Sequence, residues 1–146
     1  MNKNGYSFIN NTDLSFSFVS KGKQGEILKV VVFQEIGENI FNIALLDYLA
    51  DENKYSDMVR SDNGDMKKVL ITVMNILLDF LQNNPQCILY LEGNTRTKRL
   101  LYNRIINNNY QDIKKSLVII RENNDNQENF VQGNFYNSFY VALQTL

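Results

Sequence analysis

The chain lacks histidine and tryptophan, and it has only one cysteine, Cys87, and one proline, Pro85. Without histidine, neither a Ser-His-Asp or Cys-His catalytic arrangement nor a histidine-ligated metal site can form. General acid–base chemistry would therefore fall to Asp, Glu, Lys, Tyr or Cys side chains. A single cysteine also excludes an internal disulfide and a cysteine-rich zinc site, and it favours a reducing compartment.

Strong net charge and long apolar runs are also missing. The formal net charge is −1 over 146 residues, so no field of one sign makes nucleic acid or a membrane an obligatory partner. The longest apolar segment, VLITVMNILLDFL, is interrupted by Asn75 and Asp79 and is too short to span a bilayer. The first residues lack the apolar stretch of a signal peptide. We therefore expect a cytoplasmic protein with no membrane partner, no metal site and no cofactor.

Strand patterns dominate the first third of the chain. Nine Phe and eight Tyr argue for a packed core, and 146 residues predict one domain, residues 1–146. Alternating apolar residues predict strands in YSFIN, LSFSFVS and EILKVVVFQEI, with KGKQG as a hairpin turn. A further strand is expected over Ile40–Asp47, and later ones in QCILYLE, SLVIIRE and the aromatic C-terminal segment. The polar stretch Asp51–Asp65 and the segment RENNDNQEN are expected to be loops.

Two helices are predicted from residues that recur with a period of 3.6. In Met66–Leu81, one face carries Met66, Val69, Leu70, Val73, Ile76, Leu77 and Phe80, and the other carries Lys68, Thr72, Asn75 and Asp79. In Thr95–Asn107, the inward side carries Leu101, Tyr102, Ile105 and Ile106, and the outward side carries Arg96, Arg99 and Asn103.

These elements predict an α+β, single-domain two-layer sandwich. Its sheet is mostly antiparallel, two helices cover one face, and the order is β-β-β-α-β-α-β-β. The strand-helix-strand run from Gln86 to Glu122 would make a right-handed crossover if its two strands pair in parallel.

The segment EGNTRTKRLLYNR, from Glu92 to Arg104, combines a strand end, a Gly-Asn-Thr turn and a basic helix start. The first turn of a helix offers free N–H groups and a partial positive charge, which suits an anion. Arg96 and Arg99 could hold a phosphate or carboxylate bidentately. The alternative is a capped surface helix with a solvated basic face. The candidate ligand-binding residues are Gly93, Asn94, Thr95, Arg96, Arg99 and Tyr102, together with Asp65.

The segment SDNGD, Ser61 to Asp65, admits two interpretations. Asp62 and Asp65 could bind a hard cation, although the calcium-loop pattern is not met. A tight turn that caps the next helix is the interpretation we favour. Glu92 could act as a catalytic carboxylate or pair with Arg96 and Lys98. We expect Cys87 to pack in the core.

Taken together, FVSKGKQGEILKVVVF, FNIALLD, SDNGD and EGNTRTKRLLYNRII resemble an uncharacterised family of small Bacteroidota proteins. A looser likeness extends to domains of large phage proteins. The resemblance covers about Phe18 to Ile106 and implies no known activity. This chain departs from the pattern at Leu46 and Asn94, where Gly and Ser are usual. The matching positions are Ser20, Gly22, Gly25, Lys29, Asp47, Asn63, Gly64, Asp65, Gly93, Thr95, Arg99 and Tyr102.

Three functions are compatible with these residues. The first is a non-catalytic module that binds a phosphate-bearing ligand or a nucleic acid at the Gly93–Arg99 turn, with phage–host conflict as its setting. The second is a small metal-dependent nuclease or nucleotidyl-type toxin that uses Asp65 or Glu92 with Arg99. The third is a structural interaction partner, including a homodimer that forms through sheet edges.

Overall fold

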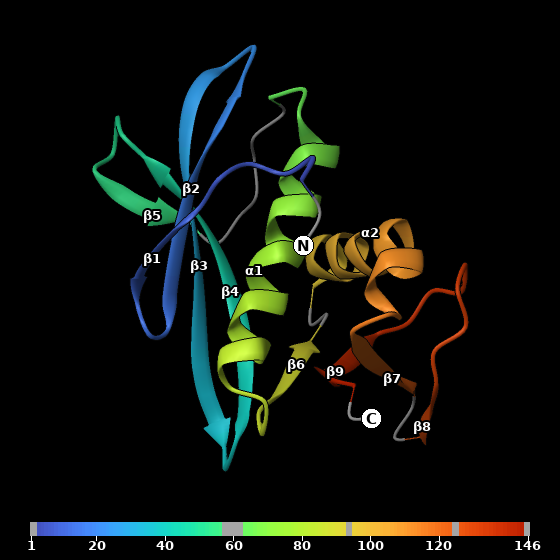
Figure 1. Cartoon of the computed structure of the whole chain (residues 1–146). Coiled ribbons are helices and arrows are strands. Elements are labelled where there is room, and N and C mark those ends of the chain that lie inside the picture. The colour runs from blue at the N-terminus through green and yellow to red at the C-terminus, as the bar shows by residue number, and fades with distance from the viewer. Residues whose placement is uncertain (1–2, 57–62, 93–94, 124–125, 145–146) are drawn as a thin grey trace. The chain divides into compact units, whose positions relative to one another are not determined.

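The described part of the chain folds into two helices and a mostly antiparallel β-structure, shown in Figure 1 as a computed structural model. Residues 3–56, 63–92, 95–123 and 126–144 are described, with only the backbone for 121–123 and 126–129. The elements are β1 Ile9–Thr12, β2 Ser15–Gly22, β3 Gly25–Gly37, β4 Ile40–Leu49, β5 Lys54–Ser56, α1 Met66–Asn83, β6 Ile88–Glu92, α2 Arg96–Ile113, β7 Leu117–Asn123, β8 Asn126–Asn129 and β9 Ser138–Leu143.

The α+β class and the order of helices among strands are as predicted. The short strands β5 and β8 add to the predicted strands, and β1 begins within the predicted strand YSFIN, at Ile9. Both added strands occupy stretches that we expected to be loops: β5 lies within the polar segment after β4, and β8 lies within RENNDNQEN. A hairpin partner supplies the backbone hydrogen bonds in both cases, so these polar sequences pair without an apolar pattern of their own. No helix in the described ranges is long and apolar enough to cross a membrane.

The chain divides into two compact units. Unit 1 comprises Met1–Gln34 and Ile43–Ile76, and unit 2 comprises Glu35–Asn42 and Leu77–Leu146. In unit 1 the strand order is β1-β2-β3-β4, with β5 beside β4. In the β2–β3 hairpin, Gly22 pairs with Gly25 across a two-residue turn, as the KGKQG segment predicted.

Unit 2 has the strand order β4-β6-β9-β7-β8, in which residues 40–42 of β4 pair in parallel with β6. We expected a right-handed crossover if β6 and β7 paired in parallel, but these two strands are not neighbours in the sheet. Strand β9 lies between them and is antiparallel to both. Leu89, Val141 and Phe139 of β6 and β9 are fully buried and form the core of this unit.

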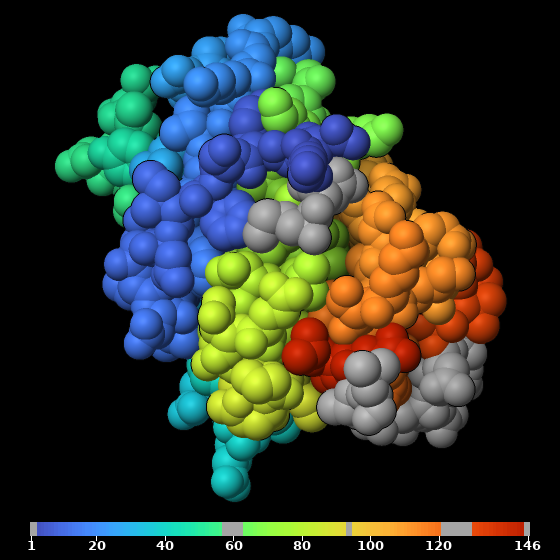
Figure 2. Space-filling view, in the orientation of Figure 1, coloured from blue at the N-terminus to red at the C-terminus, as the bar shows by residue number. Residues whose placement is uncertain are grey.

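Helix α1 is confirmed and runs two residues beyond the predicted end. Its predicted inner face is buried as expected, except that Met66 is only half-buried. The predicted outer face is wrong at Thr72 and Asn75, which are 0% and 5% exposed. The N-terminal segment covers them: the backbone N–H of Tyr6 donates to Thr72 Oγ1 at 2.7 Å. This segment is dark blue in Figure 2, where it lies across α1.

Helix α2 ends six residues beyond its predicted end, because the Asn-rich stretch after Ile106 stays helical. Ile113 in its last turn is buried, and the ring of Tyr110 packs on Phe130 at 4.8 Å between centroids. The outward placement of Asn103 is wrong, since this residue is 5% exposed. Its amide pairs with the backbone of Tyr136: Nδ2 donates to the Tyr136 carbonyl, and the Tyr136 N–H donates to Oδ1, each at 2.7 Å.

Candidate functional site

The structure describes the start of α2, where we expected an anion site, from Thr95 onward. Thr95 is the N-cap: its backbone is extended, and its Oγ1 accepts a hydrogen bond from the Lys98 N–H at 3.2 Å. Arg96 is exposed, Lys98 and Arg99 are half-buried, and the first turn holds no acidic residue.

The Thr95 side chain accepts a hydrogen bond from only one of the free backbone N–H groups at the start of α2. The first N–H groups of any helix have no intrahelical acceptor, and the helix dipole places partial positive charge there. In α2 the basic side chains add to that charge with no carboxylate in the first turn to offset it. Gly93 and Asn94, the remaining turn residues of the candidate site, lie outside the described residues.

Tyr102, which we named with this site, is buried in unit 2 at 4% exposure. Burial, and to a lesser extent the charge of Glu92, raises the pKa of its phenol to about 12. The hydroxyl therefore stays protonated through the physiological range. Cys87 is buried as expected, and burial followed by the charge of Glu35 raises the pKa of its thiol.

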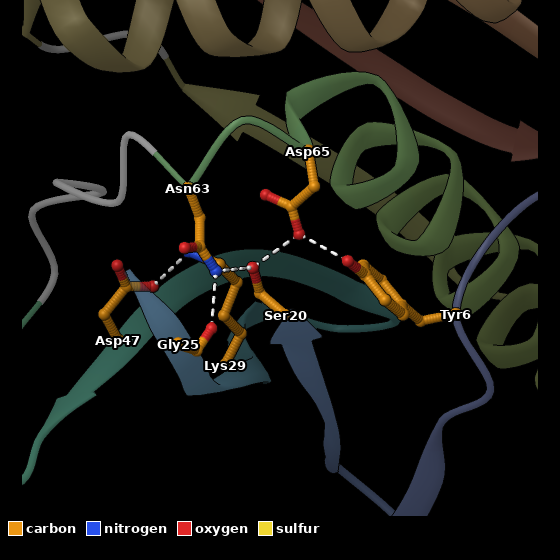
Figure 3. A network of polar contacts seen from close by, with 7 residues as sticks. All are labelled: Tyr6, Ser20, Gly25, Lys29, Asp47, Asn63 and Asp65. Carbon is orange, nitrogen blue, oxygen red and sulfur yellow. Dashed lines mark hydrogen bonds and ion pairs between the residues drawn. The ribbon is translucent and has the colours of Figure 1, made fainter. Parts of the chain in front are cut away.

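Asp65 belongs to a separate polar network in unit 1, drawn in Figure 3. Its Oδ2 accepts hydrogen bonds from the Ser20 hydroxyl at 2.5 Å and the Tyr6 hydroxyl at 2.6 Å. Ser20 is fully buried. Two short bonds to one carboxylate oxygen are charge-assisted, and they tie the N-terminal segment and strand β2 to the residue that precedes α1.

Asn63 is the second centre of this network and is 2% exposed. Its Nδ2 donates to Ser20 Oγ and to the Gly25 carbonyl, each at 3.0 Å. Its Oδ1 accepts from the Gln24 N–H at 2.6 Å, and its backbone carbonyl accepts from the Lys23 N–H at 3.2 Å. One asparagine therefore provides acceptors and donors to the whole turn of the β2–β3 hairpin.

Two glycines make this contact possible. A Cβ on Gly22 would lie 1.8 Å from the Asn63 backbone oxygen, a distance that no side chain can adopt. Gly64 has a φ of +80°, in the left-handed region that glycine enters at no steric cost. Gly22 is thus required by the close approach of the two segments, and Gly64 by its backbone conformation.

Lys29 and Asp47 form a buried ion pair across β3 and β4, with Nζ 2.8 Å from Oδ1. Both residues are about as buried as the core, at 5% and 3% exposure. Removing one partner of such a pair would leave a charge uncompensated in a dry environment. Lys29, Asp47, Ser20, Asn63 and Asp65 are all among the positions that match the family pattern. Their contacts give these positions a structural role, because they stabilise the fold of unit 1.

Tyr6 is the residue of this network that the sequence did not single out. Desolvation by burial and the hydrogen bond to Asp65 raise the pKa of its hydroxyl, which also accepts the Lys21 N–H at 3.0 Å. Its ring stacks on Phe18, and Lys68 Nζ lies 4.3 Å from the ring centroid. In the sequence, Tyr6 resembles any aromatic residue of an alternating strand, and 59 positions separate it from Asp65.

An open groove of about 500 Å³ runs beside Tyr6 in unit 1. Lys21, Glu26 and Lys68 are among its lining residues. Lys21 is the cross-strand neighbour of Glu26, so opposite charges face each other there.

The structure therefore divides the candidate residues between the two units. Thr95, Arg96, Arg99 and Tyr102 lie together on α2 in unit 2, while Asp65 belongs to the unit 1 network. The cation interpretation of SDNGD rests on Asp62 as well, which lies outside the described residues. The capping role that we favoured for this segment stays a prediction, and one carboxylate oxygen of Asp65 accepts hydrogen bonds from two hydroxyl groups.

Comparison with known proteins identifies a family for this chain but no activity. The chain matches a family described as a family of unknown function (DUF6934) over residues 2–144. No curated protein and no solved structure matches it. Because the match spans nearly the whole sequence, the chain belongs to the family of unknown function DUF6934.

Proposed function

We propose that this protein is a non-catalytic module that binds a phosphate-bearing ligand or a nucleic acid at the start of α2. One observation carries the proposal: the first turn of this 18-residue helix combines a Thr95 cap with basic side chains and has no acidic residue. Phosphate groups bind where helix N–H groups, the helix dipole and guanidinium forks converge. Arg96 and Arg99 would hold the phosphate oxygens, and Gly93 and Asn94 would let the backbone approach.

The polar network of unit 1 supports a binding role over the nuclease or toxin alternative. That alternative uses the carboxylate of Asp65 or of Glu92, and Asp65 Oδ2 already accepts two hydroxyl hydrogen bonds. Glu92 is exposed and is the remaining carboxylate of that hypothesis. A cytoplasmic location and a setting in phage–host conflict stay predictions, the latter resting on the resemblance alone.

Calorimetric titration with phosphate, a nucleotide panel and short RNA tests the proposal. We expect Arg96→Ala and Arg99→Ala to weaken binding, and Arg99→Lys to restore part of it, because lysine lacks the planar fork. Arg104→Ala is the matched control, since Arg104 is exposed on the same helix but outside the first turn. If the ligand is a polyanion, added salt should weaken binding to the wild type.

The result that contradicts the proposal is equally specific. Binding that is equal in the wild type, Arg96→Ala and Arg104→Ala proteins would exclude the start of α2 as the site. Absence of binding across the panel would favour the structural interaction partner instead.

A further inference from the structure

One edge of strand β2, in unit 1, is covered for only part of its length. Strand β1 pairs with β2 no further along than Ser17. The segment before β1 then crosses to α1, where the Tyr6 N–H donates to Thr72 Oγ1 (Figure 1). The groove beside Tyr6 lies along the uncovered edge, since Val19 and Lys21 are among its lining residues.

The backbone of Val19 points into this edge. In an antiparallel pair, successive residues direct their N–H and C=O groups alternately to one side of the strand and to the other. The Phe33 N–H donates to the Leu14 carbonyl at 2.8 Å, so the even-numbered residues of β2 face β3. The odd-numbered residues face the opposite edge, where the Lys21 N–H donates to the Tyr6 hydroxyl at 3.0 Å. No described residue pairs with the Val19 backbone on that side.

The two faces of this edge offer different side chains. On one face Val19 and its cross-strand neighbour Leu28 are half-buried and form an apolar patch. On the other face the Tyr6 ring stacks on Phe18, and Lys68 Nζ lies 4.3 Å from the centroid of that ring. An extended segment that entered the groove would therefore meet an apolar face and a basic, aromatic face.

The charges that line the groove favour an acidic ligand. Lys21, Glu26 and Lys68 all line it, and all three are exposed. Glu26 faces Lys21 across the β2–β3 pair, so these two opposite charges offset each other. Lys68, on α1, adds a positive charge that no second carboxylate among the lining residues offsets.

We propose that this groove binds an extended acidic peptide of another protein, which adds a short strand to the edge of β2. One peptide residue exchanges both backbone hydrogen bonds with Val19, which is how an exposed sheet edge recruits a strand. Phosphate oxygens only accept hydrogen bonds and would leave the Val19 carbonyl unpaired, whereas a peptide residue supplies a donor and an acceptor. The inference is independent of the anion site on α2, because every residue involved belongs to unit 1.

The alternation of side chains along a strand sets the peptide sequence. The residue opposite Val19 lies on the same face as Val19 and Leu28, so an apolar side chain suits it. The residues before and after it point to the opposite face, toward Lys68, so acidic side chains suit both positions. The blocked peptide acetyl-Ser-Glu-Val-Glu-Ser-amide has this pattern and is the probe.

Hydrogen exchange of the full chain tests the open edge before any peptide is added. The Val19 amide should exchange at least about tenfold faster than the amides of Phe18 and Ser20, which face β3. A Val19 amide as protected as its two neighbours overturns the proposal, because the edge would then be closed.

NMR titration of the full chain with the probe peptide measures binding. We expect a dissociation constant of about 0.1–10 mM, because only a few residues make contact, and the Val19 amide should shift and become protected from exchange. Lys68→Gln should raise the dissociation constant about two- to fivefold. Lys67→Gln is the matched control: Lys67 is exposed at the adjacent position of α1 and does not line the groove.

A change in the peptide tests the backbone pairing separately. N-methylation of its valine removes the N–H that donates to the Val19 carbonyl, and it should raise the dissociation constant at least about fivefold. Equal binding of the two peptides, equal effects of Lys67→Gln and Lys68→Gln, or no binding at about 20 mM peptide overturns the proposal. A short single-stranded RNA that shifts the Val19 amide where the peptide does not, with the shift lost in Lys68→Gln, would assign the groove to nucleic acid instead.

Discussion

At the residue scale, Gly22 shows how one position can link two distant segments. Gly22→Ala would place a Cβ 1.8 Å from the Asn63 backbone oxygen, so the β2–β3 turn must move away from Asn63. We expect a loss of about 2–4 kcal/mol in unfolding free energy, because buried hydrogen bonds of the network are broken. Urea denaturation measures it. Gly37→Ala is the control, since a Cβ there would meet its nearest atom at 3.7 Å, and a similar loss in both variants would contradict this account.

At the residue scale, the buried phenol of Tyr102 makes the free energy of unfolding fall at high pH. Its pKa is raised from 10.0 to about 12 by burial, followed by the charge of Glu92. The folded state therefore binds the phenolic proton more tightly than the unfolded state does. The corresponding stability is fully present below pH 10 and is lost as pH rises through 12, with about 2 kcal/mol lost by about pH 11.5.

The Tyr102→Phe variant isolates this contribution. Every other side chain is the same in both proteins, so the difference between the two pH profiles reports Tyr102 alone. We expect the wild type to lose more unfolding free energy than the variant between about pH 9 and 11.5. Parallel profiles from urea denaturation across this range would show that the phenol titrates alike in the folded and unfolded states.

At the element scale, α2 depends on a polar side chain that a helical wheel assigns to solvent. Asn103 Nδ2 donates to the carbonyls of Arg99 and Tyr136. Asn103→Asp would turn a carboxylate oxygen toward those two carbonyls, and we expect a loss of about 2–4 kcal/mol. Asn108→Asp on the same helix is exposed and should change stability by less than about 0.5 kcal/mol. Equal thermal midpoints for the two variants would refute a structural role for Asn103.

The same helices show what the sequence can and cannot predict. Apolar periodicity located both helices and the buried positions Val73, Phe80 and Ile105, because those residues lie on the apolar face of their helix. It failed at Thr72 and Asn103, whose partners are Tyr6 and Tyr136, separated from them by 66 and 33 positions. A polar residue satisfied by a distant backbone group leaves no periodic signal, so its burial appears only in the folded chain.

In the candidate site, too, local contacts could be predicted from the sequence and long-range contacts could not. The N-cap at Thr95 could be predicted because capping is local: the hydroxyl binds an N–H three residues away. The convergence of Ser20 and Asn63 on one network could not be derived from propensity, since 43 positions separate them. The resemblance singled out both residues without indicating that they meet.

At the scale of the whole molecule, the two units share continuous secondary structure. Helix α1 belongs to unit 1 as far as Ile76 and to unit 2 from Leu77 onward, and β3 and β4 also contribute residues to both. Ile76 and Leu77 are each 0% exposed. Unfolding one unit alone would therefore end α1 in the middle and break backbone hydrogen bonds of the helix there, which is costly.

We therefore expect one cooperative transition for the entire chain. Gly22→Ala in unit 1 and Asn103→Asp in unit 2 should each lower the midpoint of that single transition, because neither unit can lose stability on its own. Native-state hydrogen exchange tests this at residue level: the slowest amides of β2 and of β9 should report the same opening free energy, and each variant should lower both. Two calorimetric peaks, or a variant that accelerates exchange only within its own unit, would show that the shared elements do not couple the units.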